Sequence, residues 1–239
     1  MPNPYFQFKK FTVYHDLCAM KVGIDGVLLG AWANHQSTDK NILDLGTGSG
    51  LIALMLAQRN PLASITAIDI DENACRQAEI NFNASPWSDR LHVQHKDFHQ
   101  FQIDPEHKFD LIVSNPPYFV NSLKAGNTSR TTARHTDHLS HENLMLKSSQ
   151  MIKETGRICL ILPVTEGLQC IEFAAGKKIY CYQQVFVHPK PGAEAKRLLI
   201  EFGHQEKVCT TSHLTIESDQ RHQYSPEFSK LAADFYLKL

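Results

Sequence analysis

From about residue 40 onward, short runs of apolar residues alternate with segments whose apolar residues recur every three or four positions. The runs NILDLG, SITAIDI, FDLIVS and RICLILP have the length and composition of strands, LHVQH is a further expected strand, and the segments between them have the period of helices. Strands that are apolar on both faces belong to parallel sheets with helices on both sides. The pattern therefore predicts a doubly wound α/β fold.

Capping residues predict where several helices begin and end. Pro61 stops the helix GLIALMLAQRN, and Asp71 can cap the helix that follows it. Ser140 can cap a helix that we expect to continue as far as Gly156. Ser225 can cap a short closing helix near the C-terminus.

The last part of the chain departs from this alternation. KKIYCYQQVFVHP and AKRLLIEFG are β-rich runs joined by the turn-rich KPGAE, which predicts an antiparallel pair at one edge of the sheet. Together with the five earlier runs, this gives a mostly parallel, seven-stranded sheet with an antiparallel edge strand. The 239 residues, 42% hydrophobic and 21% charged, show neither a repeat nor a linker, so we expect a single domain.

Whole-chain properties limit the classes of protein that fit. No apolar run is long enough to span a bilayer and the N-terminus has no apolar signal region, so we expect a cytoplasmic protein. A net charge of −1 and a pI near 6.9 give no overall attraction to a polyanion, so a nucleic-acid site needs local clustering. The six cysteines form no CxxC pair, and we expect them to be reduced, mostly buried and inert.

The loop after the first buried strand, DLGTGSG, has the features of a cofactor site. Ligands in doubly wound sheets lie at the carboxyl ends of strands, and glycines let the backbone approach them closely. The spacing is GxGxG because Leu51 takes the place of the last glycine of dinucleotide binders. Asp44 places a carboxylate where a pyrophosphate is repelled and an ammonium attracted. The residues expected to form this loop site are Asp44, Gly46, Thr47, Gly48 and Gly50.

Further acids follow the next two strands. Asp69 ends the second strand, where it can accept hydrogen bonds from both ribose hydroxyls or, alternatively, only cap the next helix. Asp97, after the third strand, can bind an adenine amino group with Phe98 beside the ring, or be an ordinary loop acid. A nucleoside with a cationic amino-acid tail fits these acids and the glycine loop together. S-adenosylmethionine is such a molecule.

The fourth strand ends in the motif Asn115-Pro116-Pro117-Tyr118. An exocyclic or amide NH₂ is a poor nucleophile because its lone pair is delocalised. Two acceptors on its N–H bonds favour the tetrahedral geometry needed for attack, and the Asn115 side chain and the Pro116 carbonyl can supply them, with Pro117 restricting Pro116. Tyr118 can stack on a planar base. The motif therefore predicts methyl transfer to a planar amine; the alternative is a strand ended by a proline turn, with Tyr118 as packing.

The motifs DLGTGSG, IDID, KDF and NPPY, in this order, resemble those of the Rossmann-like class I S-adenosylmethionine-dependent amino-methyltransferases. More narrowly, the front of the chain (FKKFTVYHDLCAMKVGIDGVLLGAWA), TTARHTDHLS and PKPGAEAKRLLIEF resemble the bacterial tRNA(Val) adenine N6-methyltransferases, which modify the adenine beside the anticodon. The resemblance implies S-adenosylmethionine as cofactor and tRNA as substrate. It also implies that an N-terminal extension, residues 1–40, contributes to the cofactor site of a catalytic core, residues 41–239. The residues that it adds to the cofactor site are Lys21, Gly23 and Asp25, although VGIDG can also be a simple turn into a helix. We also expect Ile70 and Asn115 to contact the cofactor.

An RNA substrate requires basic groups near the active site. The polar segment after NPPY has no clear period, which is typical of a surface loop beside a substrate entrance. The residues of this segment expected to contact RNA are Lys124, Arg130, Arg134, His135 and His138. Lys9, Lys10, Lys190, Lys196 and Arg197 can extend the basic surface.

We expect a monomer that holds no metal. His135, His138 and His141 are spaced HxxHxxH, but neither a partnered cysteine pair nor an HExxH helix accompanies them, and methyl transfer needs no metal.

Three alternative functions remain open. A protein glutamine methyltransferase shares NPPY but usually carries a large helical N-terminal domain. A non-catalytic RNA-binding module that has kept the fold has no need of intact Asp44, Asp69, Asn115 and Tyr118. A dehydrogenase binds NAD instead of a sulfonium cofactor.

Overall fold

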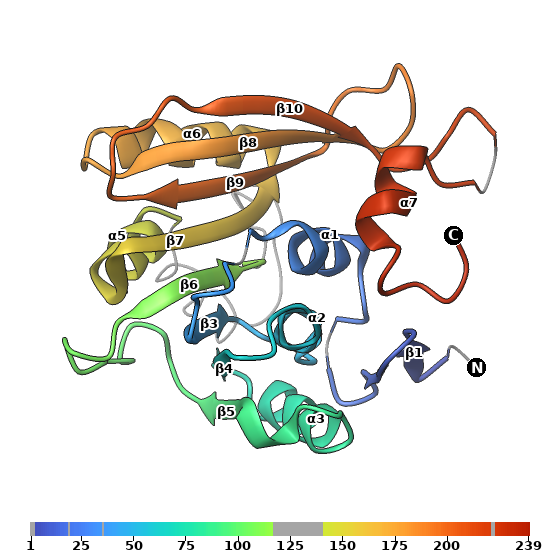
Figure 1. Ribbon diagram of the computed structural model, residues 1–239, viewed down its shortest axis with the longest axis horizontal. Coiled ribbons are helices and arrows are strands. Elements are labelled where there is room, and N and C mark those ends of the chain that lie inside the picture. Colours follow the sequence, from blue (N-terminus) through green and yellow to red (C-terminus); the bar gives the residue numbers. More distant parts are fainter. Residues whose placement is uncertain (1–2, 19, 35, 117–140, 221–222) are drawn as a thin grey trace, which may run out of the picture.

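The computed structural model describes residues 3–18, 20–34, 36–116, 141–220 and 223–239. Eight strands from these residues form one sheet: β3 (Asn41–Leu45), β4 (Ser64–Asp69), β5 (Leu91–His95), β6 (Phe109–Ser114), β7 (Ile152–Pro163), β8 (Tyr180–His188), β9 (Arg197–Gly203) and β10 (Thr210–Thr215). Their order across the sheet is β10-β8-β9-β7-β6-β3-β4-β5 (Figure 1). Only β9 runs antiparallel to its neighbours in this sheet, so the doubly wound α/β prediction is confirmed.

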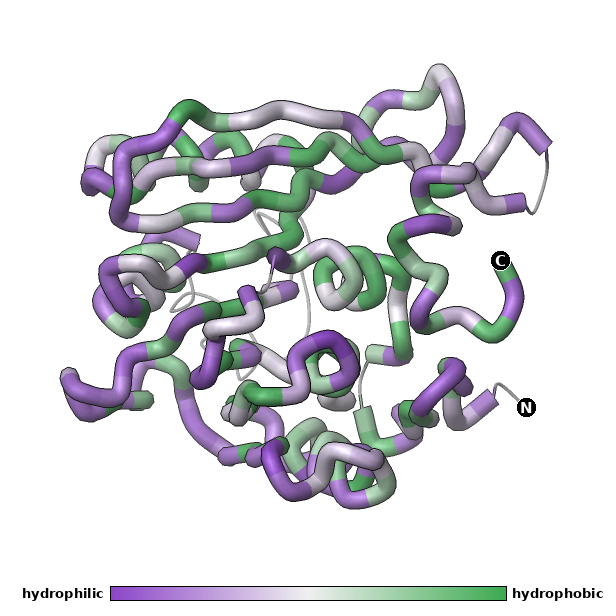
Figure 2. Tube along the Cα trace, in the orientation of Figure 1, coloured by the Kyte–Doolittle hydropathy of each residue, from purple (hydrophilic) through white to green (hydrophobic). Residues whose placement is uncertain are grey.

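Helices cover both faces of the sheet (Figure 1). The helices on one face are α1 (Ile24–Trp32), α2 (Leu51–Arg59), α3 (Glu72–Asn83) and α7 (Pro226–Ala232), and those on the other are α5 (His141–Met151) and α6 (Val164–Ala175). Alternate strand residues enter the two cores: Ile42 packs toward α1 and α2, whereas Leu43 packs toward α5 and α6. Figure 2 shows hydrophobic stretches along the inner strands and hydrophilic ones on the outer faces of helices such as α3.

The strand count and the place of the antiparallel strand differ from the prediction. The sheet has eight strands instead of seven, because β10 adds to the edge beyond β8 and runs parallel to it. The antiparallel pair β8 and β9 is confirmed, but β9 is internal, between β7 and β8. β10 has the sequence TTSHLT, of which Leu214 alone is buried. An edge strand needs few apolar residues, so the hydrophobic pattern did not reveal it.

Two helices on the second face also differ from the expectation. The helix expected to reach Gly156 ends at Met151, because Ile152 begins β7 and pairs with Phe109 of β6. α6 was not predicted. Its buried face consists of the small residues Gly167, Cys170 and Ala174, and a Cβ on Gly167 would lie 2.9 Å from Leu198 of β9. Small residues allow close packing but give a weak hydrophobic pattern.

The predicted helix caps that the structure describes are present. The Asp71 side chain accepts a hydrogen bond from the backbone N–H of Asn73 at 2.9 Å. Ser225 accepts one from the N–H of Phe228 at 3.0 Å at the start of α7. Ser140 lies outside the described residues.

The N-terminal segment packs beside the C-terminal one (Figure 1). It contains the hairpin of β1 (Tyr5–Gln7) and β2 (Thr12–Tyr14), followed by α1. The backbone N–H of Lys9 donates to Phe235 O at 2.8 Å, and its ammonium donates to Ala233 O at 2.6 Å. The two ends of the described chain are thus joined at the same side of the fold.

No helix in the described ranges is long and apolar enough to cross a membrane. All six cysteines are free. Three of them (Cys75, Cys159 and Cys170) are buried, whereas Cys209 is exposed. Its Sγ lies 3.2 Å from that of Cys181. Fewer of the cysteines are therefore buried than expected.

Candidate active site

The sheet register brings three sequence motifs together at the carboxyl ends of the parallel strands. Leu45 of β3 pairs with Ile68 of β4 on one side and with Ser114 of β6 on the other. The next residue in each chain segment is therefore Gly46, Asp69 or Asn115, and parallel pairing places these three side by side. Adjacent strands are about 4.8 Å apart, so one small molecule can contact all three. The Ser114 hydroxyl donates to Leu45 O at 2.8 Å and fixes the end of β6 against the glycine loop.

The glycine loop is held in a left-handed conformation at three positions. Gly46, Gly48 and Gly50 have φ of 69°, 55° and 80°. A Cβ on Gly46 or Gly48 would meet no atom within 4 Å, so the loop surface faces open space there. A Cβ on Gly50 would lie 2.5 Å from the ring of Phe82, so this glycine is needed for α3 to pack against the loop.

Most loop N–H groups are used inside the protein. Gly46 and Thr47 donate to Ile68 O, Gly48 donates to the Asp69 carboxylate, and Gly50 donates to Thr47 O. A pyrophosphate requires such N–H groups to be free. The loop therefore does not favour a dinucleotide.

Asp44 lies beneath the loop and is fully buried, with 0% of its surface exposed. Its Oδ2 accepts a hydrogen bond from the Thr47 hydroxyl at 2.7 Å and one from the N–H of Ala53 at 3.2 Å. The second bond caps the first turn of α2, whose N-cap, Gly50, has no side chain to do so. Oδ1 has no hydrogen-bond partner, and burial raises the pKa of Asp44 to about 7. The carboxylate thus shapes the loop and keeps one oxygen for a donor.

Asp69 stands at the rim of the same site and is partly exposed. Its Oδ2 accepts from the N–H of Gly48 and its Oδ1 from the N–H of Asp71, both at 2.9 Å. Burial raises the pKa of this carboxyl, and the two backbone hydrogen bonds oppose that shift. Each oxygen keeps a second lone pair, so Asp69 can still accept two hydroxyl donors.

Asp97 and Phe98 follow β5 and differ in exposure. Asp97 Oδ1 accepts from the N–H of His99 at 2.8 Å in a partly exposed loop. Phe98 is 7% exposed and belongs to the core beneath α5, and the Lys147 ammonium lies 5.1 Å from its ring centroid. Packing accounts for Phe98, whereas Asp97 remains available to a ligand.

The N-terminal candidates lie in different surroundings. Lys21 and Gly23 are exposed, and neither the φ of −115° at Gly23 nor its neighbours require a glycine. Asp25 is half-buried and its Oδ2 accepts a hydrogen bond from Arg197 Nε at 2.9 Å, so the pair joins α1 to β9. Ile70, directly after Asp69, is 50% exposed and presents an apolar side chain beside that acid.

The catalytic motif is described only in part. Asn115 is partly exposed and Pro116 is buried at the end of β6. Pro117 and Tyr118 lie outside the described residues. So do all five residues predicted for the RNA loop, Lys124, Arg130, Arg134, His135 and His138.

Several residues of the expected wider basic surface contact other residues of the same chain. Lys9 donates to Ala233 O and Arg197 pairs with Asp25, while Lys196 lies 3.9 Å from Glu194. Lys10 and Lys190 are exposed. Within the described ranges no three His, Cys, Asp or Glu side chains gather as a metal site, but His135 and His138 are not covered by this finding.

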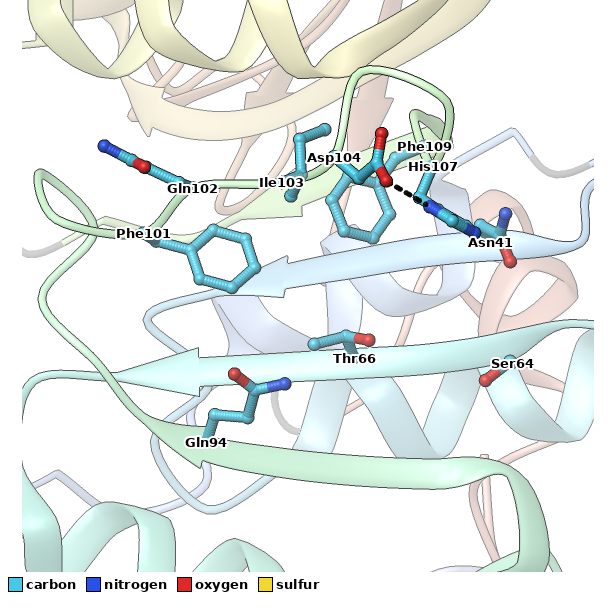
Figure 3. A pocket seen from close by; sticks show the side chains of 10 residues that line it. All are labelled: Asn41, Ser64, Thr66, Gln94, Phe101, Gln102, Ile103, Asp104, His107 and Phe109. Carbon is cyan, nitrogen blue, oxygen red and sulfur yellow. Dashed lines mark ion pairs between the residues drawn. The ribbon is translucent and has the colours of Figure 1, made fainter.

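A cavity of about 390 Å³ lies against the strands β3, β4 and β5 (Figure 3). Its lining includes Asn41 and Ser64, the first residues of β3 and β4, and Asp104 and His107 from the loop before β6. Figure 3 shows these side chains around a space between that loop and the strands. The cavity thus extends from the amino ends of β3 and β4 to Gln94, near the carboxyl end of β5, and its lining does not include Asp44, Asp69, Asp97 or Asn115.

The sequence analysis missed Gln77 and Asn81 on α3. Both are buried amides whose side chains bind the backbone of the N-terminal segment. Two amides four residues apart on the buried face of a predicted helix were a signal that could have revealed them.

Comparison with known proteins agrees with this geometry. A family model described as Methyltransferase small domain matches residues 26–165. The tRNA1(Val) (adenine(37)-N6)-methyltransferase of Parabacteroides distasonis is 50% identical over 240 residues and covers 100% of both chains. The protein of the same name from Vibrio vulnificus is 43% identical over 234 residues, 98% of this chain and 96% of that one.

A solved structure supports the fold at lower identity. A predicted O-methyltransferase from Agrobacterium tumefaciens is similar with a TM-score of 0.70 and 19% identity, covering 88% of this chain and 96% of that one. The resemblance inferred from the motifs is thereby confirmed: the chain belongs to the methyltransferase small-domain family and to the family of tRNA1(Val) (adenine(37)-N6)-methyltransferases.

Proposed function

We propose that this chain transfers a methyl group from S-adenosylmethionine to N6 of adenine 37 in tRNA1(Val). The family to which it belongs carries that name. The structural support is the register that places Gly46, Asp69 and Asn115 side by side. In this proposal Asp69 binds the nucleoside and Asn115 binds the amine, and both follow strands that flank the glycine loop.

The residues present fit S-adenosylmethionine. Asp44 Oδ1 is a buried acceptor without a partner, suited to an ammonium that reaches it directly or through a water. Asp69 can accept the ribose hydroxyls, and the exposed Ile70 side chain offers an apolar surface to adenine. Asp97 can accept from the adenine amino group. When bound, this cofactor supplies an electrophilic methyl group on a sulfonium.

Asn115 and Pro116 are proposed to hold the attacking amine. The Asn115 side-chain oxygen accepts one N–H and the Pro116 carbonyl accepts the other, which orients the nitrogen lone pair toward the methyl carbon. The new N–C bond forms as the S–C bond breaks, and the methylated nitrogen then loses a proton to solvent. The proposed stacking of the base on Tyr118 rests on the sequence motif.

A loop adenine suits this site energetically. Extruding a base that lies outside a duplex costs less than the few kcal/mol that a paired base requires. We propose that the basic segment after NPPY, with Lys124, Arg130, Arg134, His135 and His138, holds the surrounding phosphates. We further propose one domain, in which residues 1–40 contribute to the cofactor site, acting as a metal-free monomer in the cytoplasm.

The test uses tRNA from cells that lack the gene. Purified protein and radiolabelled S-adenosylmethionine should incorporate label into this tRNA, and digestion should recover it as N6-methyladenosine at position 37 of tRNA1(Val). The same tRNA from gene-bearing cells, already methylated, is the matched control. A protein that binds the cofactor and incorporates no label into the deficient tRNA contradicts the proposal. Label in a release-factor glutamine instead would support the glutamine methyltransferase.

A further inference from the structure

Asn81 joins the N-terminal segment to the glycine loop. It is 1% exposed, and its Nδ2 donates to Ser49 O and to Tyr14 O, both at 2.8 Å. Its Oδ1 accepts from the N–H of Tyr14 at 2.9 Å. Both amide donors and one acceptor site are thus used, and they connect parts of the chain that are far apart in sequence. Ser49 belongs to the glycine loop, so Asn81 contacts the candidate site from behind.

Gln77, one turn earlier on α3, binds the same segment. It is fully buried, and its Oε1 accepts from the N–H of Leu17 at 2.9 Å. The chain from Tyr14 to Leu17 therefore runs along α3 from Asn81 back to Gln77, toward the N-terminus of the helix. That end of α3 begins at Glu72, three residues after Asp69. We call residues 14–18 and 20–23 the strap.

The strap continues toward the acids of the site. Leu17 is held at Gln77, in the half of α3 that begins at the Asp71 N-cap, so the next residue, Cys18, lies toward that end of the helix. Burial raises the pKa of the Cys18 thiol to about 11, and the carboxylates of Asp69 and Asp71 add to that shift. At its far end the strap leads into α1, where Asp25 pairs with Arg197 at 2.9 Å. Lys21 and Gly23, both exposed, lie between these two anchored ends.

Close packing of α3 makes the Asn81 contact possible. A Cβ on Gly50 would lie 2.5 Å from the Phe82 ring and 3.3 Å from Ala78 Cβ. Gly50 therefore lets α3 approach the glycine loop closely enough for Asn81, the residue before Phe82, to reach Ser49.

We propose that Asn81 is a positioning residue for cofactor binding, which holds the strap against the glycine loop so that the strap forms one wall of the site. The inference rests on the proposed function, because it takes S-adenosylmethionine as the ligand. Asn81 touches no reacting atom, so its loss should weaken cofactor binding and spare the methyl-transfer step. Losing these hydrogen bonds should raise the dissociation constant about tenfold or more.

The experiment compares Asn81→Ala with Asn83→Ala, an exposed asparagine on the same helix. Calorimetry gives the dissociation constant of S-adenosylhomocysteine, the demethylated product, and single-turnover assays at saturating cofactor give the transfer rate. Asn81→Ala should raise the dissociation constant about tenfold and change the saturated rate less than about threefold, whereas Asn83→Ala should change neither. Loss of the saturated rate with unchanged affinity would overturn the inference.

Cys18 gives a second readout that is independent of activity. N-ethylmaleimide labelling followed by peptide mass spectrometry reports its accessibility, with the exposed Cys209 as internal standard. In the wild type, S-adenosylhomocysteine should slow labelling of Cys18 but not of Cys209. Without ligand, Cys18 should be labelled faster in Asn81→Ala than in the wild type. Absence of ligand protection in the wild type would show that the strap is not a wall of the site.

Two further arms separate the possible failures. If Asn81→Ala does not fold, Gln77→Ala removes the other strap contact, and it should raise the dissociation constant by a smaller factor. A Gln77→Ala variant with wild-type affinity and wild-type Cys18 labelling would then overturn the inference. A wild-type protein that binds no S-adenosylhomocysteine contradicts the proposed function itself, and this inference with it.

Discussion

Asp39 and Asp110, at the amino ends of the parallel strands (the amino edge of the sheet), have different partners from Asp44 and Asp69, at the carboxyl ends (the carboxyl edge). At the amino edge, Asp39 forms a buried ion pair with Arg157, and Asp110 pairs with Lys153 at 2.7 Å. At the carboxyl edge, the hydrogen-bond donors described for Asp44 and Asp69 are neutral: a threonine hydroxyl and backbone N–H groups. Burial accordingly raises the pKa of both carboxyls.

This difference distinguishes structural from functional acids. A buried carboxylate beside a cation is already compensated within the fold. One that has only neutral donors remains costly to ionise, and a cationic ligand can supply the missing charge. The electrostatics at the two ends of the strands therefore favour the carboxyl ends, with Asp44 and Asp69, as the candidate site.

Breaking the ion pair at the amino edge should have the largest effect. Arg157→Met leaves the Asp39 carboxylate buried and unpaired, which should lower the free energy of unfolding by about 3–5 kcal/mol. Urea denaturation measures this loss. Adding Asp39→Leu should recover part of it, because the Asp39 charge is then no longer buried alone; Glu201, a second buried carboxyl stabilised by Arg157, limits the recovery. A loss below about 1 kcal/mol for the single variant would mean that the Asp39–Arg157 ion pair does not stabilise this end of the sheet.

Removing the proposed amine-binding group at the carboxyl edge should affect chemistry alone. Asn115→Ala should lower the single-turnover methylation rate about 100-fold or more and change the cofactor dissociation constant less than about threefold. The control is Asn41→Ala, which removes an amide that lines the cavity of Figure 3 and should leave both values unchanged. Equal losses of rate and affinity in Asn115→Ala would instead indicate a structural residue.

Neutralising Asp44 should weaken cofactor binding without weakening the fold. Asp44→Asn can keep the acceptor for Thr47 and Ala53 but lacks the charge for an ammonium, so the dissociation constant should rise about tenfold or more. The wild-type pKa is raised from 3.8 to about 7, so the stability it contributes is present below 3.8 and is lost as pH rises through about 7. The stability of Asp44→Asn relative to wild type should therefore increase over that window. Thermal melts across pH and calorimetry measure both effects, and a variant that melts lower at every pH contradicts this reading.

The smallest effect is the pH dependence of cofactor binding. A cationic ligand favours ionised Asp44, so affinity for S-adenosylhomocysteine should rise as pH increases through about 7, the pKa of this group. The ligand's α-ammonium keeps its charge through this window, so the rise should level off once Asp44 is fully ionised. Calorimetry should show a change of severalfold in the wild type and a flat profile in Asp44→Asn. A flat wild-type profile would show that the charge of Asp44 does not contribute to binding of the ligand.

Much of the fold followed from hydrophobic periodicity. The strands β3 and β6 and the helix α2 have clear apolar patterns, because these elements are buried on nearly all sides. β10 and α6 escaped prediction because an edge strand and a helix packed through small residues need little apolar surface. The end of α5 was misplaced because pairing of Ile152 with Phe109 overrode a helical period.

The sequence alone determined which residues stand at the carboxyl ends of the strands, because motif order and parallel topology bring Gly46, Asp69 and Asn115 to one edge. It could not show that Asp44 lies under the loop or that Asp25 pairs with Arg197, since both depend on contacts between distant segments. Nor could it show that Asn81 holds the strap to the loop. Local patterns encode strand ends, whereas the hydrogen-bond partners of buried polar groups are fixed only when tertiary packing brings them together.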